Sequence, residues 1–296
     1  MQWSGFIQLI RPANIVTAMS DIIAGVAIAG LFTLNFWNQD VVLDLCLLIF
    51  STSCLYGGGI VFNDVFDIEE DKIHRPERVI PSGKVSLKQA KRFGVLLFLF
   101  GILAAFGVSI LSGGLATGIT LLALLYDKYS KHHLVMGPLN MGACRGANLL
   151  LGMSIVQPIP SGFLWIGLLP IIFVAAITLT AQKESQGKNK RAIMVAMALD
   201  ATIVAGILLI SRYFNFSLKS ASIFIVLWYG VNFLAKLKAI RHNHPIAIKK
   251  AVKTGVLSLI PLNASYVAGF GSIYLGLATL CLLPLSIYLA KKFAVT

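Results

Sequence analysis

Long, nearly uninterrupted apolar segments constrain the fold of this chain more than any other feature of its sequence. A bilayer core of roughly 30 Å requires about 20 mostly apolar residues for one helical crossing. Such segments follow one another along the 296 residues, and only 12% of the residues are charged, against about 25% in an average soluble domain. The sequence therefore predicts an integral membrane protein. No polar stretch is long enough to build a separate soluble domain.

We expect nine or ten spans, because one apolar segment is short and the last two are closely spaced. They cover approximately residues 14–34, 41–62, 92–111, 113–127, 134–156, 163–181, 192–213, 217–236, 251–268 and 271–290. The segments are apolar throughout, as in GVLLFLFGILAAFGVSILS, whereas a barrel strand alternates with a period of two. The predicted fold is an all-α bundle of nine or ten transmembrane helices in a single domain, residues 1–296.

Basic residues indicate which ends of the spans face the cytoplasm. Of the 25 Lys and Arg residues, all but Arg212, Lys219 and the intramembrane Arg145 lie at one set of alternate span ends. The positive-inside rule places that set in the cytoplasm. Ten crossings, unlike nine, return Lys291 and Lys292 to that side together with the N-terminus. The same asymmetry accounts for the net charge of +13 without a nucleic-acid partner.

The most informative polar stretch follows the second predicted span. If that span continues as a helix, Asn63, Asp67 and Asp71 lie at positions i, i+4 and i+8 on one face, with Asp64 beside them. Three carboxylates within two turns repel one another unless a cation lies between them. Mg²⁺ prefers oxygen ligands and often completes its coordination with substrate phosphates. This face therefore suits a Mg²⁺–diphosphate.

Basic residues follow the acidic stretch directly. Arg75 and Arg78 are suited to holding phosphate oxygens, since a guanidinium forms paired hydrogen bonds with them. The alternative is a solvated acidic helix end whose carboxylates pair with these basic neighbours, as Asp71 with Arg75 at i+4.

Two adjoining motifs carry a family resemblance. Residues Asn63 to Asp71 match N-D-x-x-D-x-x-x-D at every fixed position, and residues 75–83 read RPERVIPSG. With RPAN at residues 11–14 and YDKYSK at residues 126–131, this pattern resembles the UbiA superfamily of intramembrane prenyltransferases. The resemblance covers nearly the whole chain, with Val79 in place of a proline.

The resemblance implies a helix bundle around a central cavity that is capped on the cytoplasmic side and opens laterally to lipid. Such enzymes bind an isoprenyl diphosphate through Mg²⁺ and transfer the isoprenyl group to a lipophilic acceptor. We expect a bacterial inner-membrane protein with its N-terminus and catalytic loops in the cytoplasm. The candidate catalytic residues are Asp67, Asp71, Arg78 and Lys131, the candidate metal ligands Asn63, Asp64, Asp67 and Asp71, and the candidate substrate-binding residues Asn14, Asn63, Arg75, Tyr126, Arg145, Asn148, Lys183 and Glu184.

The chain departs from the family where a second aspartate-rich motif is expected, after the sixth span. Residues 180–191 read TAQKESQGKNKR, in which only Glu184 is acidic. Either Lys183 or Lys188 replaces a second metal as a counter-charge, or the protein has lost prenyl transfer and binds or transports a lipid. Together with CRGANLLLG at residues 144–152, this pattern most resembles the EboC-type UbiA-like proteins.

Several single polar residues allow two interpretations. Arg145 and Asn148 lie within the fifth span, where a charge usually faces a partner or a cavity; either Arg145 contacts substrate or it pairs within the bundle, with Asp200 as the candidate partner. Asn14 either faces the cavity or caps the first helix. Tyr126 either reaches the substrate or lies at the interface.

Overall fold

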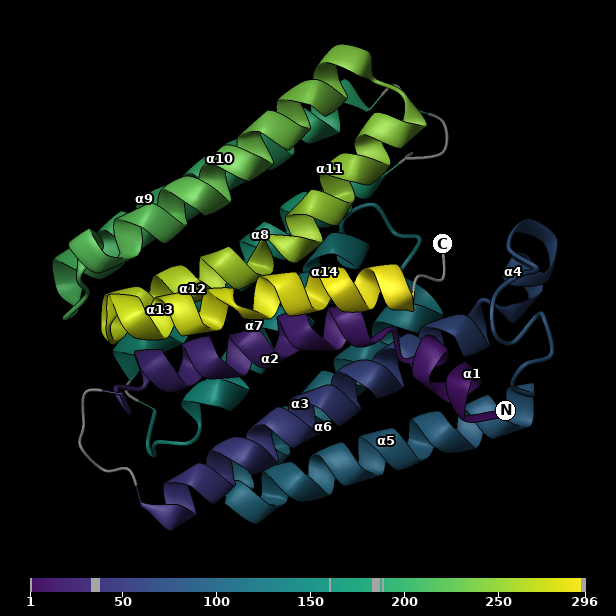
Figure 1. The fold of residues 1–296 in the computed structure, drawn as a ribbon, viewed down its shortest axis with the longest axis horizontal. Helices are drawn as coiled ribbons and strands as arrows, with labels where there is room; N and C mark the ends of the chain where they lie inside the picture. Colours follow the sequence, from purple (N-terminus) through teal and green to yellow (C-terminus); the bar gives the residue numbers. More distant parts are fainter. Residues whose placement is uncertain (1, 33–37, 160, 183–186, 188, 294–296) are drawn as a thin grey trace.

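The computed structural model describes residues 2–32, 38–159, 161–182, 187 and 189–293, and all regular structure among them is helical (Figure 1). The prediction of an all-α bundle is confirmed. The α-helices are α1 (Gln2–Leu9), α2 (Pro12–Ile28), α3 (Gln39–Phe66), α4 (Ile68–His74), α5 (Leu87–Val108), α6 (Ile110–Leu125), α7 (Met136–Met153), α8 (Leu168–Ala181), α9 (Lys190–Tyr213), α10 (Leu218–His242), α11 (Pro245–Leu257), α12 (Leu259–Phe270), α13 (Ile273–Leu280) and α14 (Leu282–Lys292). A π-helix, η1 (Tyr126–Ser130), extends α6, and a 3₁₀-helix, η2 (Ser161–Gly167), precedes α8.

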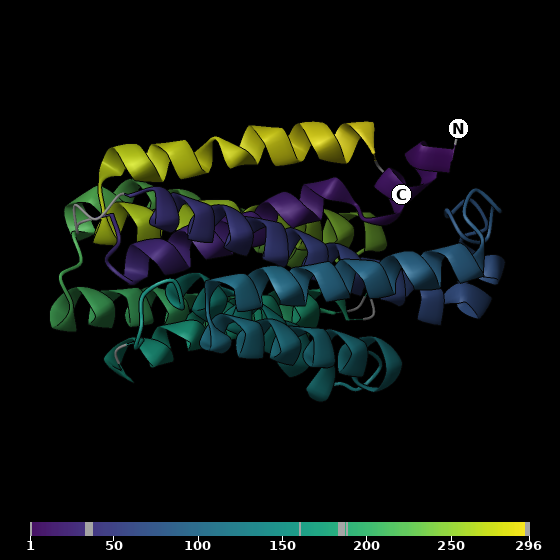
Figure 2. The same ribbon diagram turned by 90° about the horizontal axis from the view of Figure 1, so that it is seen from below.

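Each predicted span contains one long helix or two consecutive ones, and the long helices run side by side along the bundle (Figures 1 and 2). Seven helical segments of the described chain are long and apolar enough to cross a membrane: Gln39–Phe66, Leu87–Val108, Ile110–Ser130, Ser161–Ala181, Lys190–Tyr213, Leu218–His242 and Ile273–Lys292. The remaining predicted spans coincide with α2, which has 17 residues, with α7, and with the α11–α12 pair. Length and hydropathy support seven crossings, and the two or three further crossings stay a prediction.

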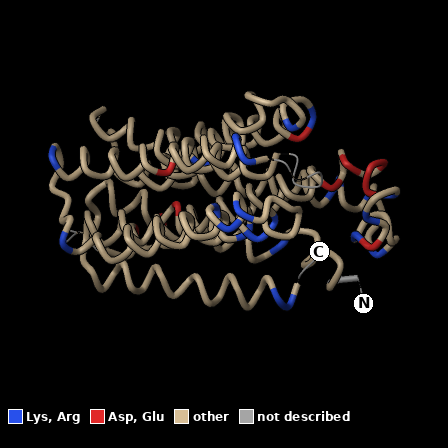
Figure 3. The backbone as a smooth tube through the Cα atoms, turned by 90° about the horizontal axis from the view of Figure 1, so that it is seen from above, with Lys and Arg blue, Asp and Glu red and all other residues tan. Residues whose placement is uncertain are grey.

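The distribution of side chains agrees with a membrane location. Large apolar side chains on α5 face outward, with Phe100 51% and Leu103 55% exposed, as expected of a surface that contacts lipid. Lys and Arg gather at the end of the bundle where both termini lie, and few are present at the opposite end (Figure 3). This arrangement agrees with the charge asymmetry found in the sequence.

Helices α2 and α7 pack closely because glycines face each other across their contact. A β-carbon on Gly25 would lie 2.8 Å from the Cα of Gly152, and one on Gly152 would lie 2.5 Å from the carbonyl oxygen of Ile22. Small residues allow this approach, which drives helix association in lipid through van der Waals contact. The contact also brings Asp21 of α2 next to Arg145 of α7.

The intramembrane charge at Asp200 has a different partner from the one we expected. Lys236 Nζ of α10 lies 2.5 Å from Asp200 Oδ2 of α9, and both side chains are buried. The expected Asp200–Arg145 pair is therefore wrong. Helix α9 packs against α8 and α10, whereas Arg145 lies on α7 at its contact with α2.

The close α2–α7 contact predicts that Gly152→Ala lowers the free energy of unfolding by about 1–3 kcal/mol, because the added methyl group forces the two helices apart. Gly118→Ala on α6 is the matched control, since nothing lies within 4 Å of the added carbon. The control should be neutral or stabilising by up to about 1 kcal/mol. Thermal unfolding in detergent measures both, and equal melting temperatures would contradict the packing.

Candidate active site

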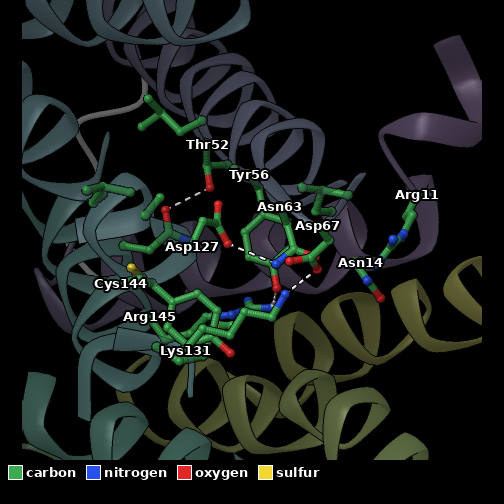
Figure 4. A pocket seen from close by; sticks show the side chains of 18 of the residues that line it. Arg11, Asn14, Thr52, Tyr56, Asn63, Asp67, Asp127, Lys131, Cys144 and Arg145 are labelled. Carbon is green, nitrogen blue, oxygen red and sulfur yellow. Dashed lines mark hydrogen bonds and ion pairs between the residues drawn. The ribbon is translucent and has the colours of Figure 1, made fainter. Parts of the chain in front are cut away.

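A cavity of about 360 Å³ lies among α2, α3, α6, η1 and α7 (Figure 4). Its apolar lining includes Leu55, Ile60, Ile119, Ala123 and Met141. Its polar lining comprises Arg11, Asn14, Thr52, Tyr56, Asn63, Asp67, Arg75, Arg78, Tyr126, Asp127, Lys131, Cys144, Arg145 and Asn148. The cavity thus combines an apolar chamber with a strongly charged group of side chains.

One face of α3 supplies a row of the cavity side chains. Thr52, Tyr56, Asn63 and Asp67 recur at intervals of four or seven residues and therefore share a side of the helix. Asp64 lies one position beyond Asn63, which turns it by about 100° from that face. Asp64 accordingly does not line the cavity.

The two remaining acidic positions of the motif bind arginines. Asp64 Oδ1 lies 2.5 Å from Arg11 Nη2 and 3.2 Å from Arg78 Nη1, and Asp71 Oδ2 lies 2.6 Å from the same Arg78 nitrogen. Asp71 does not join Asn63 and Asp67 in the cavity lining, since a turn at Asp67 separates α3 from α4 and the Asp71 carboxylate binds Arg78.

The four expected metal ligands are divided in the structure, since Asn63 and Asp67 line the cavity whereas Asp64 and Asp71 bind arginines, and their assignment stays a prediction. Within the described chain, no group of three or more His, Cys, Asp and Glu side chains is arranged to hold a metal ion. The sequence also allowed the carboxylates to pair with basic neighbours. Asp71 does so, but its partner is Arg78 and not Arg75. Arg75 instead lines the cavity.

Two further contacts connect α3 with the turn after α6. Lys131 Nζ donates a hydrogen bond to Asp67 Oδ2, and Asn63 Nδ2 donates one to Asp127 Oδ1 at 3.0 Å. Asp127 is only 8% exposed, and our sequence analysis assigned it no role. The sequence did contain a signal for Asp127, since this residue lies within the YDKYSK segment, between the predicted residues Tyr126 and Lys131.

Arg145 pairs within the bundle, as one of its two interpretations expected, and it also lines the cavity, so that substrate contact stays a prediction. Its Nη1 lies 2.7 Å from Asp21 Oδ2, and its Nη2 donates to Thr17 Oγ1 at 2.6 Å and to the Tyr56 hydroxyl at 2.9 Å. The guanidinium also stacks over the Tyr56 ring, 4.6 Å from its centroid. Full pairing of this kind is what a buried charge at membrane depth requires.

Asn148 extends the same network. Its Nδ2 donates to Asp21 Oδ2 and to the carbonyl oxygen of Ala18, both at 3.0 Å, and its Oδ1 accepts from Thr52 Oγ1 at 2.7 Å. Asp21 also accepts a hydrogen bond of 2.7 Å from Asn263 of α12. The network therefore connects α2, α3, α7 and α12 beside the cavity.

The other predicted residues divide into two groups. Asn14 and Tyr126 line the cavity; capping by Asn14 is wrong, because Arg11 occupies the N-cap position of α2. Lys183, Glu184 and Lys188 lie outside the described residues.

Comparison with known proteins identifies the family. The model of the UbiA prenyltransferase family matches residues 22–259, and the chain belongs to that family. The digeranylgeranylglyceryl phosphate synthase of Methanosarcina mazei is 38% identical over 173 residues, which is 58% of this chain and 58% of that protein. The enzyme of the same name from Methanothermobacter thermautotrophicus is 27% identical over 236 residues, covering 78% and 80% of the two chains. The matched part thus spans little more than half the length of the first relative.

Solved structures share the fold. A structure of digeranylgeranylglyceryl phosphate synthase has a TM-score of 0.69 at 23% identity and covers 91% of this chain and 98% of its own. A UbiA homologue from Archaeoglobus fulgidus bound to DMAPP and Mg²⁺ has a TM-score of 0.58 at 15% identity and covers 93% and 99%. The two curated relatives named above are archaeal and carry the name of the synthase. The expected EboC-type subfamily and the expected bacterial membrane are therefore not supported.

The Asp21–Arg145 pair predicts strong coupling in a double-mutant cycle. Either Asp21→Asn or Arg145→Met leaves a buried charge unpaired and should cost about 3–5 kcal/mol of stability. The double variant should cost less than the sum of the two, since neither charge is then left alone. Equilibrium unfolding in detergent measures the cycle, and strictly additive effects would show that the two side chains do not depend on each other.

Proposed function

We propose that this protein is a Mg²⁺-dependent intramembrane prenyltransferase that moves an isoprenyl group from its diphosphate to a lipophilic acceptor. The observation that carries the proposal is the cavity itself. It combines the oxygen donors of Asn63 and Asp67 with the basic side chains of Arg75, Arg78 and Lys131, next to an apolar chamber. A diphosphate head and a hydrocarbon tail require these two environments side by side.

The charge that develops during the reaction suggests a role for each group of cavity residues. Departure of diphosphate from an allylic carbon builds negative charge, which Mg²⁺ and positioned cations stabilise. Arg75, Arg78 and Lys131 are placed to bind its oxygens. The apolar residues of the chamber, Leu55 and Ile119 among them, would hold the isoprenyl group and exclude water from the carbocation.

We further propose that the donor carries a geranylgeranyl group and that the acceptor is a lipid built on glyceryl phosphate. Support comes from the relatives, whose name describes a product with two geranylgeranyl groups on a glyceryl phosphate. Support for the cation comes from the homologue structures that contain Mg²⁺ together with DMAPP or GPP.

The topology we propose has ten crossings with both termini in the cytoplasm. Both termini lie at the basic end of the bundle, which agrees with an even number of crossings and with the positive-inside rule. The bilayer then supplies the lipophilic acceptor, and no nucleic-acid partner is required.

A second candidate function is lipid binding or transport without prenyl transfer. One observation favours it: residues 180–191 contain Glu184 as their only acidic residue, where the family usually has a second aspartate-rich motif. Binding of a prenyl diphosphate with no turnover across a panel of lipid acceptors would favour this function over transfer.

Transfer of a labelled geranylgeranyl group by purified protein tests the proposal. Asp67→Asn should reduce the Mg²⁺-dependent rate by about 100-fold or more, because a charged ligand facing the diphosphate site is lost. Glu70→Gln removes an exposed carboxylate of α4 and is the control, which should keep the wild-type rate. Equal rates for Asp67→Asn and wild-type protein would rule out this assignment.

A further inference from the structure

The cavity contains a set of oxygen donors that differs from the one expected from the sequence motif. We infer that the divalent cation is held by Asn63, Asp67 and Asp127, so that Asp127 takes the role that the motif alone assigns to Asp64 and Asp71. This inference rests on the proposed function and names the metal ligands of the same site.

Each of the three side chains retains one oxygen for a cation. Asn63 donates a hydrogen bond from its Nδ2 to Asp127 Oδ1, and the amide oxygen of Asn63 is not used in this bond. Asp67 uses Oδ2 for Lys131. Among the described residues, Asn63 Oδ1, Asp67 Oδ1 and Asp127 Oδ2 have no hydrogen-bond partner.

These three side chains belong to one part of the cavity. All of them line it, and Figure 4 shows Asp127, Asn63 and Asp67 next to one another, with dashed lines joining Asn63 to Asp127 and Asp67 to Lys131. Two carboxylates and an amide oxygen are donors that Mg²⁺ accepts, with the remaining positions left to phosphate oxygens and water.

Asp64 and Asp71 are poorly placed for the same task. Both are buried, at 4% and 3% exposure, and neither lines the cavity. Their carboxylates already neutralise Arg11 and Arg78. A cation bound there would displace these arginines and leave Arg78, which is 7% exposed, buried without its counter-charges, which is costly.

A separate observation places an anionic ligand beside the proposed cation. Arg78 lines the cavity, is 7% exposed, and its Nε–H has no acceptor among the described residues. Its Nη1 is held by Asp64 and Asp71, which fixes the direction of the guanidinium. A phosphate oxygen in the cavity would satisfy the free Nε–H through a charge-assisted hydrogen bond.

Asp127 also offers a reason why one aspartate-rich motif suffices here. Residues 180–191 provide a single carboxylate, whereas η1 provides the carboxylate of Asp127, which lies next to Asn63 of α3. Lys131 lines the cavity beside Asp67, and its ammonium group would bind a phosphate oxygen next to the cation.

Direct binding of Mn²⁺ to the purified full-length chain tests the inference without measuring turnover. Electron paramagnetic resonance counts free Mn²⁺ with and without inorganic pyrophosphate. Asp127→Asn should weaken Mn²⁺ binding by about 10-fold or more, and Asp71→Asn, which tests the ligand set of the motif, should weaken it less. Glu70→Gln, at an exposed position of α4, is the matched control and should leave the affinity unchanged. Asparagine at 127 still accepts the hydrogen bond from Asn63, so a purely structural role would leave the affinity unchanged. Asp127→Glu, which restores the carboxylate, should recover most of the binding.

The outcomes separate the inference from the function on which it rests. Unchanged Mn²⁺ affinity in Asp127→Asn, or a greater loss in Asp71→Asn, would overturn the inference and leave the prenyltransferase proposal intact. Failure of the wild-type protein to bind Mn²⁺ even with pyrophosphate would overturn the proposed function itself. Loss of binding in Asp127→Asn with recovery in Asp127→Glu would establish Asp127 as a ligand.

Discussion

Pairing of charges in a medium of low polarity governs the organisation of this bundle. An ionised side chain at membrane depth is expensive unless an opposite charge meets it. Asp21 binds Arg145, and Asp200 binds Lys236, in both cases between different helices. Because each pair can form only when its two helices have the correct depth and rotation, these contacts restrict the bundle to one arrangement. The cavity is positioned by that arrangement.

The charges around the cavity follow the same principle but are less completely paired. Asp64 and Asp71 lie outside the cavity lining and are held by arginines, whereas Asp67 and Asp127 line the cavity and each has one oxygen without a hydrogen-bond partner among the described residues. Charged side chains that gather at a cavity, with oxygens free to meet a ligand, are typical of a binding site. The network around Arg145 is structural, because the Arg145 guanidinium is paired within the bundle, although Arg145 also lines the cavity.

Much of the candidate site could be predicted from short motifs. Asn63, Asp67, Arg78 and Lys131 were recognised from their spacing and family pattern, and all of them line one cavity. The assignment of Asp71 as a metal ligand stays a prediction, because a turn at Asp67 separates α3 from α4 and the Asp71 carboxylate, which is not part of the cavity lining, binds Arg78. Helix ends depend on the local chain turn and on tertiary contacts, so periodicity cannot locate them reliably.

The sequence by itself determined the membrane location, the helical architecture and the chemical character of the site, because hydropathy and residue type act locally along the chain. Only the tertiary structure decided which carboxylates meet arginines and which face the cavity. Arg11 binds Asp64 across 53 residues, and Arg145 binds Asp21 across 124. The energy of a charge in lipid depends on its nearest neighbours in space, and those neighbours are set by the packing of helices that are distant in the chain.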